Sequence, residues 1–246
     1  MRAVFFSDFH CKRGDLTKIE LLQNFSSDIL DKVDKVFILG DLFEFYHGFH
    51  GYIFPWYKGV ADVLKKLTKN GKSVVLLEGN HEFGMGSFFE NFTGVTCGRD
   101  MTIDLDGKKI FISHGDGSGL FCLGSILKST FIYNIMDFLG PAATWKGAQV
   151  AGMFLSRKTK PRNPNIRDVF RKYAGIKLAE DYDIVIFGHS HMPDKMVLEI
   201  ENKKKVYLNT GDFGTSFDYV LYESNTGFTL EKYNPQPPLK DEKGCQ

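Results

Sequence analysis

The first part of the chain alternates short apolar runs with amphipathic stretches. Three apolar runs predict buried strands; they are AVFF (3–6), VFIL (36–39) and SVVLLE (73–78). Two sets of apolar residues between these runs recur at helical spacing; they are Leu22, Phe25, Ile29 and Val33, and then Val60, Ala61, Leu64 and Leu67. Because strands and helices alternate, we predict a parallel sheet with crossover helices.

Strand or hairpin patterns recur in four later segments. They are the hairpin 104–113 around Asp106-Gly107, the strand DIVIFG (183–188), which is expected to return to the sheet, and the antiparallel hairpins 196–209 and 218–233. Residues 117–175 lack such a pattern, which predicts a helical insertion. Residues 235–246 are rich in Pro and charge and are expected to form a flexible tail. We therefore predict one α/β domain over residues 1–234.

Composition narrows the class of protein. The chain has 246 residues, of which 43% are hydrophobic and 25% charged, as in an ordinary globular protein. A net charge of +1 gives no electrostatic reason to expect a nucleic-acid partner. The four cysteines form no CxxC pair, which favours reduced thiols in a cytoplasm. The apolar runs are too short for a signal peptide or a membrane span.

Side chains that can bind metals follow five of the predicted strands. They are Asp8 and His10 after 3–6, Asp41 after 36–39, Asn80 and His81 after 73–78, His114 after 104–113, and His189 and His191 after 183–188. Sites in open α/β sheets form outside the carboxyl ends of the strands, so these side chains are expected to converge. Each pattern alone is compatible with an ordinary turn, but five together point to one site.

The chemistry of this set suits a pair of metal ions. Carboxylates, imidazoles and one amide, without a thiolate, favour Mn, with Fe or Zn as alternatives. Two such ions about 3.5–4 Å apart can clamp a phosphoryl oxygen and activate a water molecule. Asp41 stands alone at its strand end and is the expected bridging carboxylate. The amide of Asn80 would supply an oxygen without adding negative charge, which suits an anionic phosphate substrate.

Taken together, the motifs DFH, GDLFE, GNHE, SHGD and GHSH between residues 8 and 191 resemble the calcineurin-like metallophosphoesterase superfamily. The resemblance implies a two-sheet β-sandwich flanked by helices. It assigns one metal to Asp8, His10, Asp41 and His191, and the second to Asp41, Asn80, His114 and His189. It also implies that His81 is catalytic, steadying the transition state or protonating the leaving oxygen.

Four longer stretches resemble the UDP-2,3-diacylglucosamine diphosphatases of lipid A biosynthesis. They are GDLFEFYHG, GNHEFGMGSFFENFTGVT, SHGDGSG and YLNTGDFGTSFDYVLYE. The resemblance implies hydrolysis of the pyrophosphate bond to give UMP and 2,3-diacylglucosamine 1-phosphate. The best-known members of that family have Arg at the position of His81, and Cys-Thr-Asp-Asp where this chain reads GSGLFCLG (117–124). A related but distinct substrate therefore remains open.

The insertion has the composition expected of a lipid contact. Residues 117–156 carry three charges, which are Lys128, Asp137 and Lys146, and seven Lys or Arg residues against one Asp follow between 157 and 172. We expect the insertion to act as a lid over acyl chains, beside a basic strip that suits a diphosphate and an anionic membrane. The expected substrate-binding residues are Asn80, Arg157, Lys160 and Asn163. A helical hairpin buried on the domain, with a solvated basic edge, is the alternative.

Two other functions remain open at this point. The first is a soluble metallophosphoesterase acting on a nucleotide or another phosphoester. The second is a non-catalytic interaction protein on the same fold, although all seven ligand positions are filled. The expected location is the cytoplasm, with peripheral attachment to the inner membrane as an option, and the oligomeric state is left open.

Overall fold

The computed structural model describes residues 1–117, 130–156 and 165–235. A six-stranded sheet has the order β13-β12-β1-β2-β4-β6. Its strands are β1 (Arg2–Phe6), β2 (Lys35–Ile38), β4 (Ser73–Leu77), β6 (Thr96–Gly98), β12 (Asp218–Glu223) and β13 (Gly227–Lys232). Strands β1, β2, β4 and β6 run parallel, so their carboxyl ends lie at one edge of the sheet.

A five-stranded sheet packs against the first and has the order β10-β11-β9-β8-β7. Its strands are β7 (Asp100–Leu105), β8 (Lys108–Ser113), β9 (Ile184–Phe187), β10 (Asp194–Ile200) and β11 (Lys203–Asn209). Strands β8, β9 and β11 are parallel. The expectation that 183–188 returns to the first sheet was wrong, because β9 pairs with β8 and β11 in the second. The two-sheet sandwich implied by the family resemblance is confirmed.

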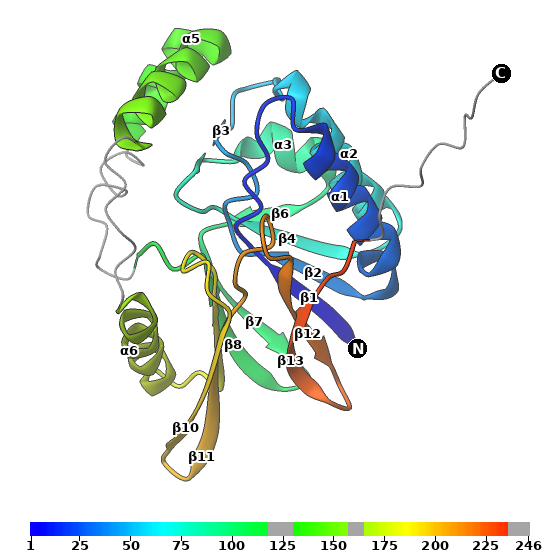
Figure 1. Cartoon of the computed structure of the whole chain (residues 1–246), viewed down its shortest axis with the longest axis vertical. Helices are drawn as coiled ribbons and strands as arrows, with labels where there is room; N and C mark the ends of the chain where they lie inside the picture. The colour runs from blue at the N-terminus through cyan, green and yellow to red at the C-terminus, as the bar shows by residue number, and fades with distance from the viewer. Residues whose placement is uncertain (118–129, 157–164, 236–246) are drawn as a thin grey trace, which may run out of the picture.

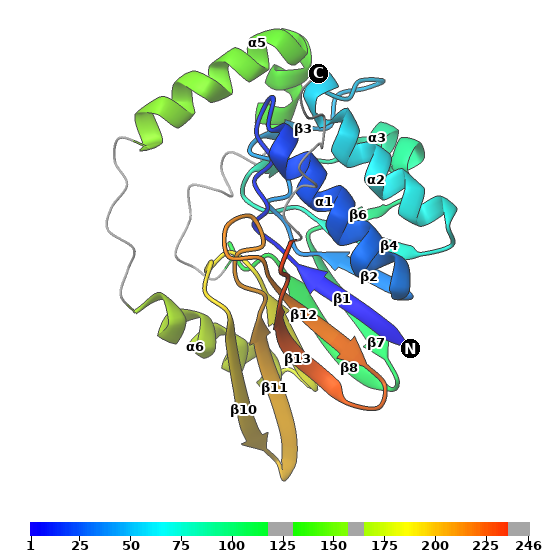
Figure 2. The ribbon, with the colours of Figure 1, turned by 45° about the vertical axis from the view of Figure 1, so that its right-hand side comes forward.

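Helices cover both outer faces of the sandwich (Figures 1 and 2). They are α1 (Leu16–Asp28), α2 (Lys58–Lys69), α3 (Gly86–Thr93), α5 (Thr130–Ser156) and α6 (Ile166–Ala179), with 3₁₀ turns at Leu30–Lys32 and Pro55–Tyr57. Helices α1 and α2 lie on the first sheet and α6 on the second. None of the helices within 1–117, 130–156 and 165–235 combines the length and the apolar character needed to cross a bilayer.

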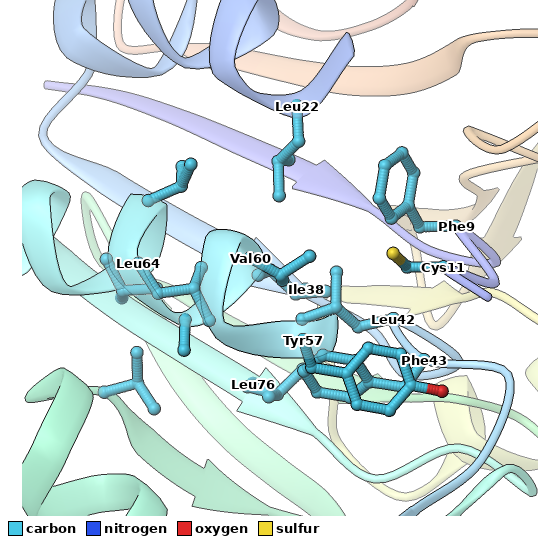
Figure 3. Packing of buried hydrophobic residues seen from close by; sticks show 14 of the residues in the cluster. Phe9, Cys11, Leu22, Ile38, Leu42, Phe43, Tyr57, Val60, Leu64 and Leu76 are labelled. Atoms are coloured by element: carbon cyan, nitrogen blue, oxygen red, sulfur yellow. The ribbon is translucent and has the colours of Figure 1, made fainter. Parts of the chain in front are cut away.

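Strand alternation explains why the core has three layers. On β1, Val4 and Phe6 face the layer beneath α1 and α2, whereas Ala3 and Phe5 face the layer between the sheets. Figure 3 shows the first layer, in which Leu22 of α1 and Val60 of α2 approach the sheet. A third layer lies between the second sheet and α6, around Phe170. Parallel strands buried on both faces therefore read as continuous apolar runs.

Helix α5 lies beside β3 (Tyr46–His47), which pairs in parallel with β5 (Glu82–Phe83). A bend interrupts α5 at Gly140, whose φ of 74° and ψ of 172° are not helical, just before Pro141. The second half of α5 contributes Trp145, which is 7% exposed and packs on Phe54 and Trp56. Part of the insertion is therefore docked on the domain.

Candidate metal centre and active site

The two sheets bring all seven expected metal ligands together at the carboxyl ends of their parallel strands. Asp8, His10, Asp41 and Asn80 follow strands of the first sheet, and His114, His189 and His191 follow strands of the second. The site therefore spans the join between the two sheets. It lies at the end of the sandwich where the loops after β1, β2, β4, β8 and β9 meet.

Backbone strain is concentrated at these residues. Five of the seven ligand candidates have a positive φ, between 50° and 62°; they are Asp8, His10, Asp41, His189 and His191. Residues other than Gly rarely adopt this backbone conformation, and each instance costs about 1–3 kcal/mol. Such a cost persists where the surrounding structure enforces it, which marks these loops as a functional site.

The first group of ligand candidates consists of Asp8, His10 and His191, whose ligand atoms lie within 4.8 Å of one another. Oδ1 of Asp8 lies 3.3 Å from Nε2 of His191 and 3.9 Å from Nε2 of His10. Oδ2 of Asp8 accepts hydrogen bonds from the Ser7 hydroxyl and from the backbone N–H of His189. Oδ1 is buried and accepts no hydrogen bond within the described parts of the chain, which is the pattern expected of a metal ligand.

The second group consists of Asp41, His114 and His189, with Asn80 beside them. Nδ1 of His114 donates to the carbonyl of Leu39 at 2.7 Å, so Nε2 of the neutral ring carries a lone pair. This nitrogen lies 3.2 Å from Oδ1 of Asn80 and 3.0 Å from Nδ1 of His189. Oδ2 of Asp41 is 3.3 Å away. Several electron-pair donors thus meet at one point, which a proton or a metal ion must satisfy.

Asp41 connects the two groups. Its Oδ2 lies 3.3 Å from Nε2 of His114 and 3.7 Å from Nε2 of His10. Oδ1 accepts the backbone N–H of His81 at 3.0 Å. A Cβ atom at Gly79 would lie 2.1 Å from Oδ1, so only glycine leaves room for this carboxylate.

Buried Glu82 holds the loops that carry Asp41 and Asn80. Its carboxylate accepts backbone N–H groups of Asp41, Phe43 and Gly79 at 2.9, 3.0 and 2.8 Å. Burial and the nearby negative charge of Asp41 raise the pKa of Glu82 to about 7. These hydrogen bonds fix the backbone on either side of the ligand pair.

The charges of the metal-free site follow from its geometry. Burial alone would raise the pKa of Asp41, but His114 and His81 hold it well below its ordinary value. Burial opposes a charge on His114 as well, yet the neighbouring Asp41 raises the pKa of His114 to about 10. Burial lowers the pKa of both His10 and His189 to about 3, so these two rings are neutral and able to bind metal at pH 7.

His81 stands at the rim of the site. Its Nδ1 donates to the Glu44 carbonyl at 2.6 Å, which leaves Nε2 facing the centre, 4.0 Å from Oδ2 of Asp41. Burial would lower its pKa, but Asp41 and the bond to Glu44 outweigh burial and raise it. The ring packs edge-on against His10. This arrangement favours the protonated form of His81 beside the site.

Asp212 is a residue of the site that the sequence analysis missed. It follows β11, and its Oδ2 accepts a hydrogen bond from Nδ1 of His191 at 2.8 Å. The pattern over 196–209 predicts only a hairpin, but β11 is also parallel to β9. The carboxyl end of β11 therefore lies at the same edge as the other ligand loops. The signal in the sequence was the carboxylate of Asp212, three residues beyond the end of that strand.

The expected substrate-binding residues cannot all be placed. Asn80 lies in the site, whereas Arg157, Lys160 and Asn163 lie outside the described residues. In α5, Phe131, Ile135 and Phe138 are 72%, 39% and 90% exposed. The alternative for the insertion was a helical hairpin buried on the domain with a solvated basic edge; Thr144 and Trp145 of α5 are buried, whereas these three side chains are not.

The chain is similar to several known proteins. Residues 1–193 match the calcineurin-like phosphoesterase family. A UDP-2,3-diacylglucosamine hydrolase of Aliivibrio fischeri (strain MJ11) is 29% identical over 249 residues, 94% of this chain and 98% of the relative. One of Vibrio vulnificus (strain YJ016) is 26% identical over 248 residues, again 94% and 98%. The solved structure of an archaeal phosphodiesterase has 13% identity and a TM-score of 0.47, covering 94% of this chain and 99% of that one.

The family match extends from β1 through the GHSH motif and so contains every expected metal ligand. Members of the family depend on divalent metal ions, and two groups of acidic and imidazole ligands are present in the described structure. The chain belongs to the calcineurin-like phosphoesterase family and is a metal-dependent phosphoesterase.

Proposed function

We propose that this enzyme hydrolyses the pyrophosphate bond of UDP-2,3-diacylglucosamine in lipid A biosynthesis. The products are UMP and 2,3-diacylglucosamine 1-phosphate. The observation that carries the proposal is the full-length similarity to hydrolases of that name, which covers 94% of the chain and includes the insertion. The chemistry is consistent with it, because a dinuclear site suits the hydrolysis of a phosphoanhydride.

The residues present fit two divalent ions. Asp8, His10 and His191 would hold one, and Asn80, His114 and His189 the other, with Asp41 shared between them. The mixed nitrogen and oxygen donors favour Mn, with Fe or Zn as alternatives. When bound, such ions polarise a phosphoryl oxygen and lower the pKa of a bound water.

The protein side chains would divide the remaining work. Nε2 of His81 faces the centre from the rim of the site and the pKa of the ring is raised, so His81 would donate a proton to the oxygen that leaves phosphorus. Asp212 orients the ring of His191, and Glu82 holds the backbone of Asp41. UMP keeps one of the two phosphates and 2,3-diacylglucosamine 1-phosphate keeps the other. The hydroxyl group of the water goes to one product and its remaining hydrogen to the other.

Helix α5 would serve as the acyl-chain lid. Its exposed apolar side chains Phe131, Ile135 and Phe138 lie in the part that carries Tyr133 and Asp137, which contact residues just beyond the metal loops. Apolar side chains exposed in this number support a contact with acyl chains or membrane rather than with water. We place the enzyme in the cytoplasm, peripherally bound to an anionic membrane through α5 and the basic strip at 157–172.

A product assay tests this function. Purified protein with Mn²⁺ should convert UDP-2,3-diacylglucosamine to UMP and the lipid phosphate. Its kcat/KM should exceed that for UDP-N-acetylglucosamine by at least about 100-fold, because acyl burial contributes about 0.8 kcal/mol per CH₂. Equal turnover of both UDP-sugars would favour the soluble phosphoesterase alternative. No hydrolysis of any phosphoester, with metal bound, would favour the non-catalytic one.

A further inference from the structure

Most of the described side chains of α5 are exposed or half-buried. Of side chains 131–150, only Thr144 and Trp145 are buried. In the first half of the helix, the hydroxyl of Tyr133 accepts a hydrogen bond from Arg99 at 3.0 Å. One turn later, Oδ1 of Asp137 lies 3.0 Å from Nε2 of His47. The ring of Tyr133 also lies against the ring of His47, with the ring centroids 5.6 Å apart, and Met136 packs against the core. Two polar contacts therefore add to apolar packing in fixing this half of the helix.

His47 is a buried residue, 3% exposed, on β3. Its Nδ1 lies 2.7 Å from the carbonyl oxygen of Phe83, which can only accept a hydrogen bond. Its Nε2 faces the carboxylate of Asp137, an acceptor when ionised. The ring of His47 therefore contacts β5 through Nδ1 and α5 through Nε2.

Asp137 is the only acidic residue in the sequence of α5. Its neighbours in the chain, Met136 and Phe138, are apolar, and Phe138 is 90% exposed. A lone carboxylate in such an apolar helix lowers its suitability for a lipid surface. The carboxylate of Asp137 contacts the buried His47 of β3, and this contact gives a structural reason for an acidic residue in this helix.

The β3–β5 pair connects this contact to the metal loops. Strand β5 directly follows Asn80 and His81, and Tyr46 pairs in register with Glu82, whose carboxylate holds the backbone of Asp41. His47 pairs in register with Phe83. A shift of α5 at Asp137 would therefore be transmitted through His47 to Phe83, which lies two residues after His81.

We propose that His47 is a positioning residue that anchors α5 to the metal loops through Asp137, and that this anchor determines the affinity for acylated substrates. The second part rests on the proposed function, in which α5 covers the acyl chains. The first part is a statement about the protein alone and can be tested without substrate.

Two replacements of His47 separate its two hydrogen bonds. The amide nitrogen of Asn takes the place of Nδ1, so His47→Asn keeps the bond to Phe83 and loses the reach to Asp137. The amide nitrogen of Gln takes the place of Nε2, so His47→Gln keeps Asp137 and loses Phe83. Asp137→Ala removes the partner on α5. Lys146→Gln removes an exposed charge from the same helix and serves as the control.

Hydrogen exchange of the α5 amides, measured without substrate, tests the anchor. His47→Asn and Asp137→Ala should raise exchange across residues 131–139 by about tenfold or more, the range expected for loss of a hydrogen bond to a carboxylate. His47→Gln and Lys146→Gln should raise it much less. Equal exchange in His47→Asn and the unaltered protein would overturn the anchor.

Kinetics test the consequence for substrates. In His47→Asn, KM for the diacylated UDP-sugar should rise about tenfold, while kcat and the hydrolysis of a small chromogenic phosphodiester stay within about twofold. A parallel loss on both substrates would instead show that His47 merely supports the metal loops. If exchange rises but the unaltered enzyme does not prefer acylated substrates, the anchor stands and the proposed substrate fails.

Discussion

Oδ2 of Asp212 accepts a hydrogen bond from Nδ1 of His191 at 2.8 Å. The same carboxylate is fixed by the backbone N–H of Thr215, which donates to Oδ1 at 2.9 Å. Burial opposes the charge of Asp212, but the hydrogen bond from His191 lowers its pKa below the ordinary value. With its proton held at Nδ1, His191 has a lone pair on Nε2, which lies on the side of Asp8. This is the orientation that a metal ligand requires.

Replacing Asp212 with Asn should weaken one metal site. Loss of a carboxylate behind a histidine ligand typically costs 10–100-fold in metal affinity. We expect a loss of this size for one of two bound ions, measured by titration against a chromophoric chelator. Asp218→Asn is the matched control, because Asp218 bonds to Ser216 in the same segment and not to a ligand. Unchanged affinity in Asp212→Asn would remove the orienting role.

Replacing Asp41 with Ala should affect both ions. Oδ2 of Asp41 lies 3.7 Å from a ring nitrogen of His10 and 3.3 Å from that of His114, so its carboxylate lies between the two ligand groups. We expect elemental analysis after dialysis to find both metals depleted and hydrolysis reduced by at least about 1000-fold. Full metal content in this variant would rule out Asp41 as the bridge. His191→Ala should deplete one ion preferentially.

Metal affinity should increase with pH across the neutral range. In the metal-free protein, Asp41 raises the pKa of His114 to about 10 against the effect of burial, so His114 is protonated at pH 7. A metal ion must displace this proton, and affinity should rise by up to about tenfold per pH unit until pH 10. The rings of His10 and His189, with pKa values near 3, are already neutral there.

Calorimetry in buffers of different ionisation enthalpy measures this release directly. About one proton should be released at pH 7 when the site is filled. His114→Ala should lose the pH slope together with part of the metal affinity. Binding that is independent of pH between 6 and 9 would contradict a protonated His114.

His81→Ala should impair turnover more than metal binding. Its Nδ1 is occupied by the Glu44 carbonyl, and its Nε2 lies 4.0 Å from Oδ2 of Asp41, at the exposed rim. We expect a loss of about 10²–10⁴-fold in kcat, the usual contribution of general acid–base assistance, with both metals retained. In His81→Ala, a substrate whose leaving group has a low pKa should be hydrolysed at most of the original rate. Metal depletion equal to that of Asp41→Ala would identify His81 as a ligand instead.

The convergence of the candidate metal ligands was largely predictable because these residues follow local patterns. Each parallel strand is buried on both faces and reads as an apolar run, and the residue types that come next are few. The order in which the strands pair was harder to predict from the sequence. β9 was assigned to the first sheet because an apolar run such as IVIF does not encode its neighbours, which are β8 and β11. The two-sheet arrangement came from the family resemblance.

Residues that act through distant partners were missed. Asp212 is 21 residues from His191 and sits in NTGDFG, a segment with the composition of a turn. His47 is 90 residues from Asp137, and the sequence gives no sign that a polar residue at this position is buried. Short elements such as α3 and β6 were also missed, because eight or three residues carry too little periodicity.

The exposed side of α5 allows a test of the lid that leaves the fold intact. Phe131, Ile135 and Phe138 are 72%, 39% and 90% exposed, so their replacement by Ser should change the free energy of unfolding little. If these side chains bind acyl chains, each CH₂ buried contributes about 0.8 kcal/mol. Four methylenes would then account for about 3 kcal/mol, or some two orders of magnitude in affinity.

The triple Ser variant should therefore raise KM for the diacylated UDP-sugar by about 100-fold, measured in mixed micelles of fixed composition. Hydrolysis of a small unacylated phosphodiester should remain within about twofold, because the metal ligands lie on other elements. Val197→Ser is the matched control, since Val197 is 56% exposed on β10 and distant in the fold from α5. If the triple variant slows both substrates equally, α5 acts as scaffold, and acyl-chain recognition must be sought elsewhere in the insertion.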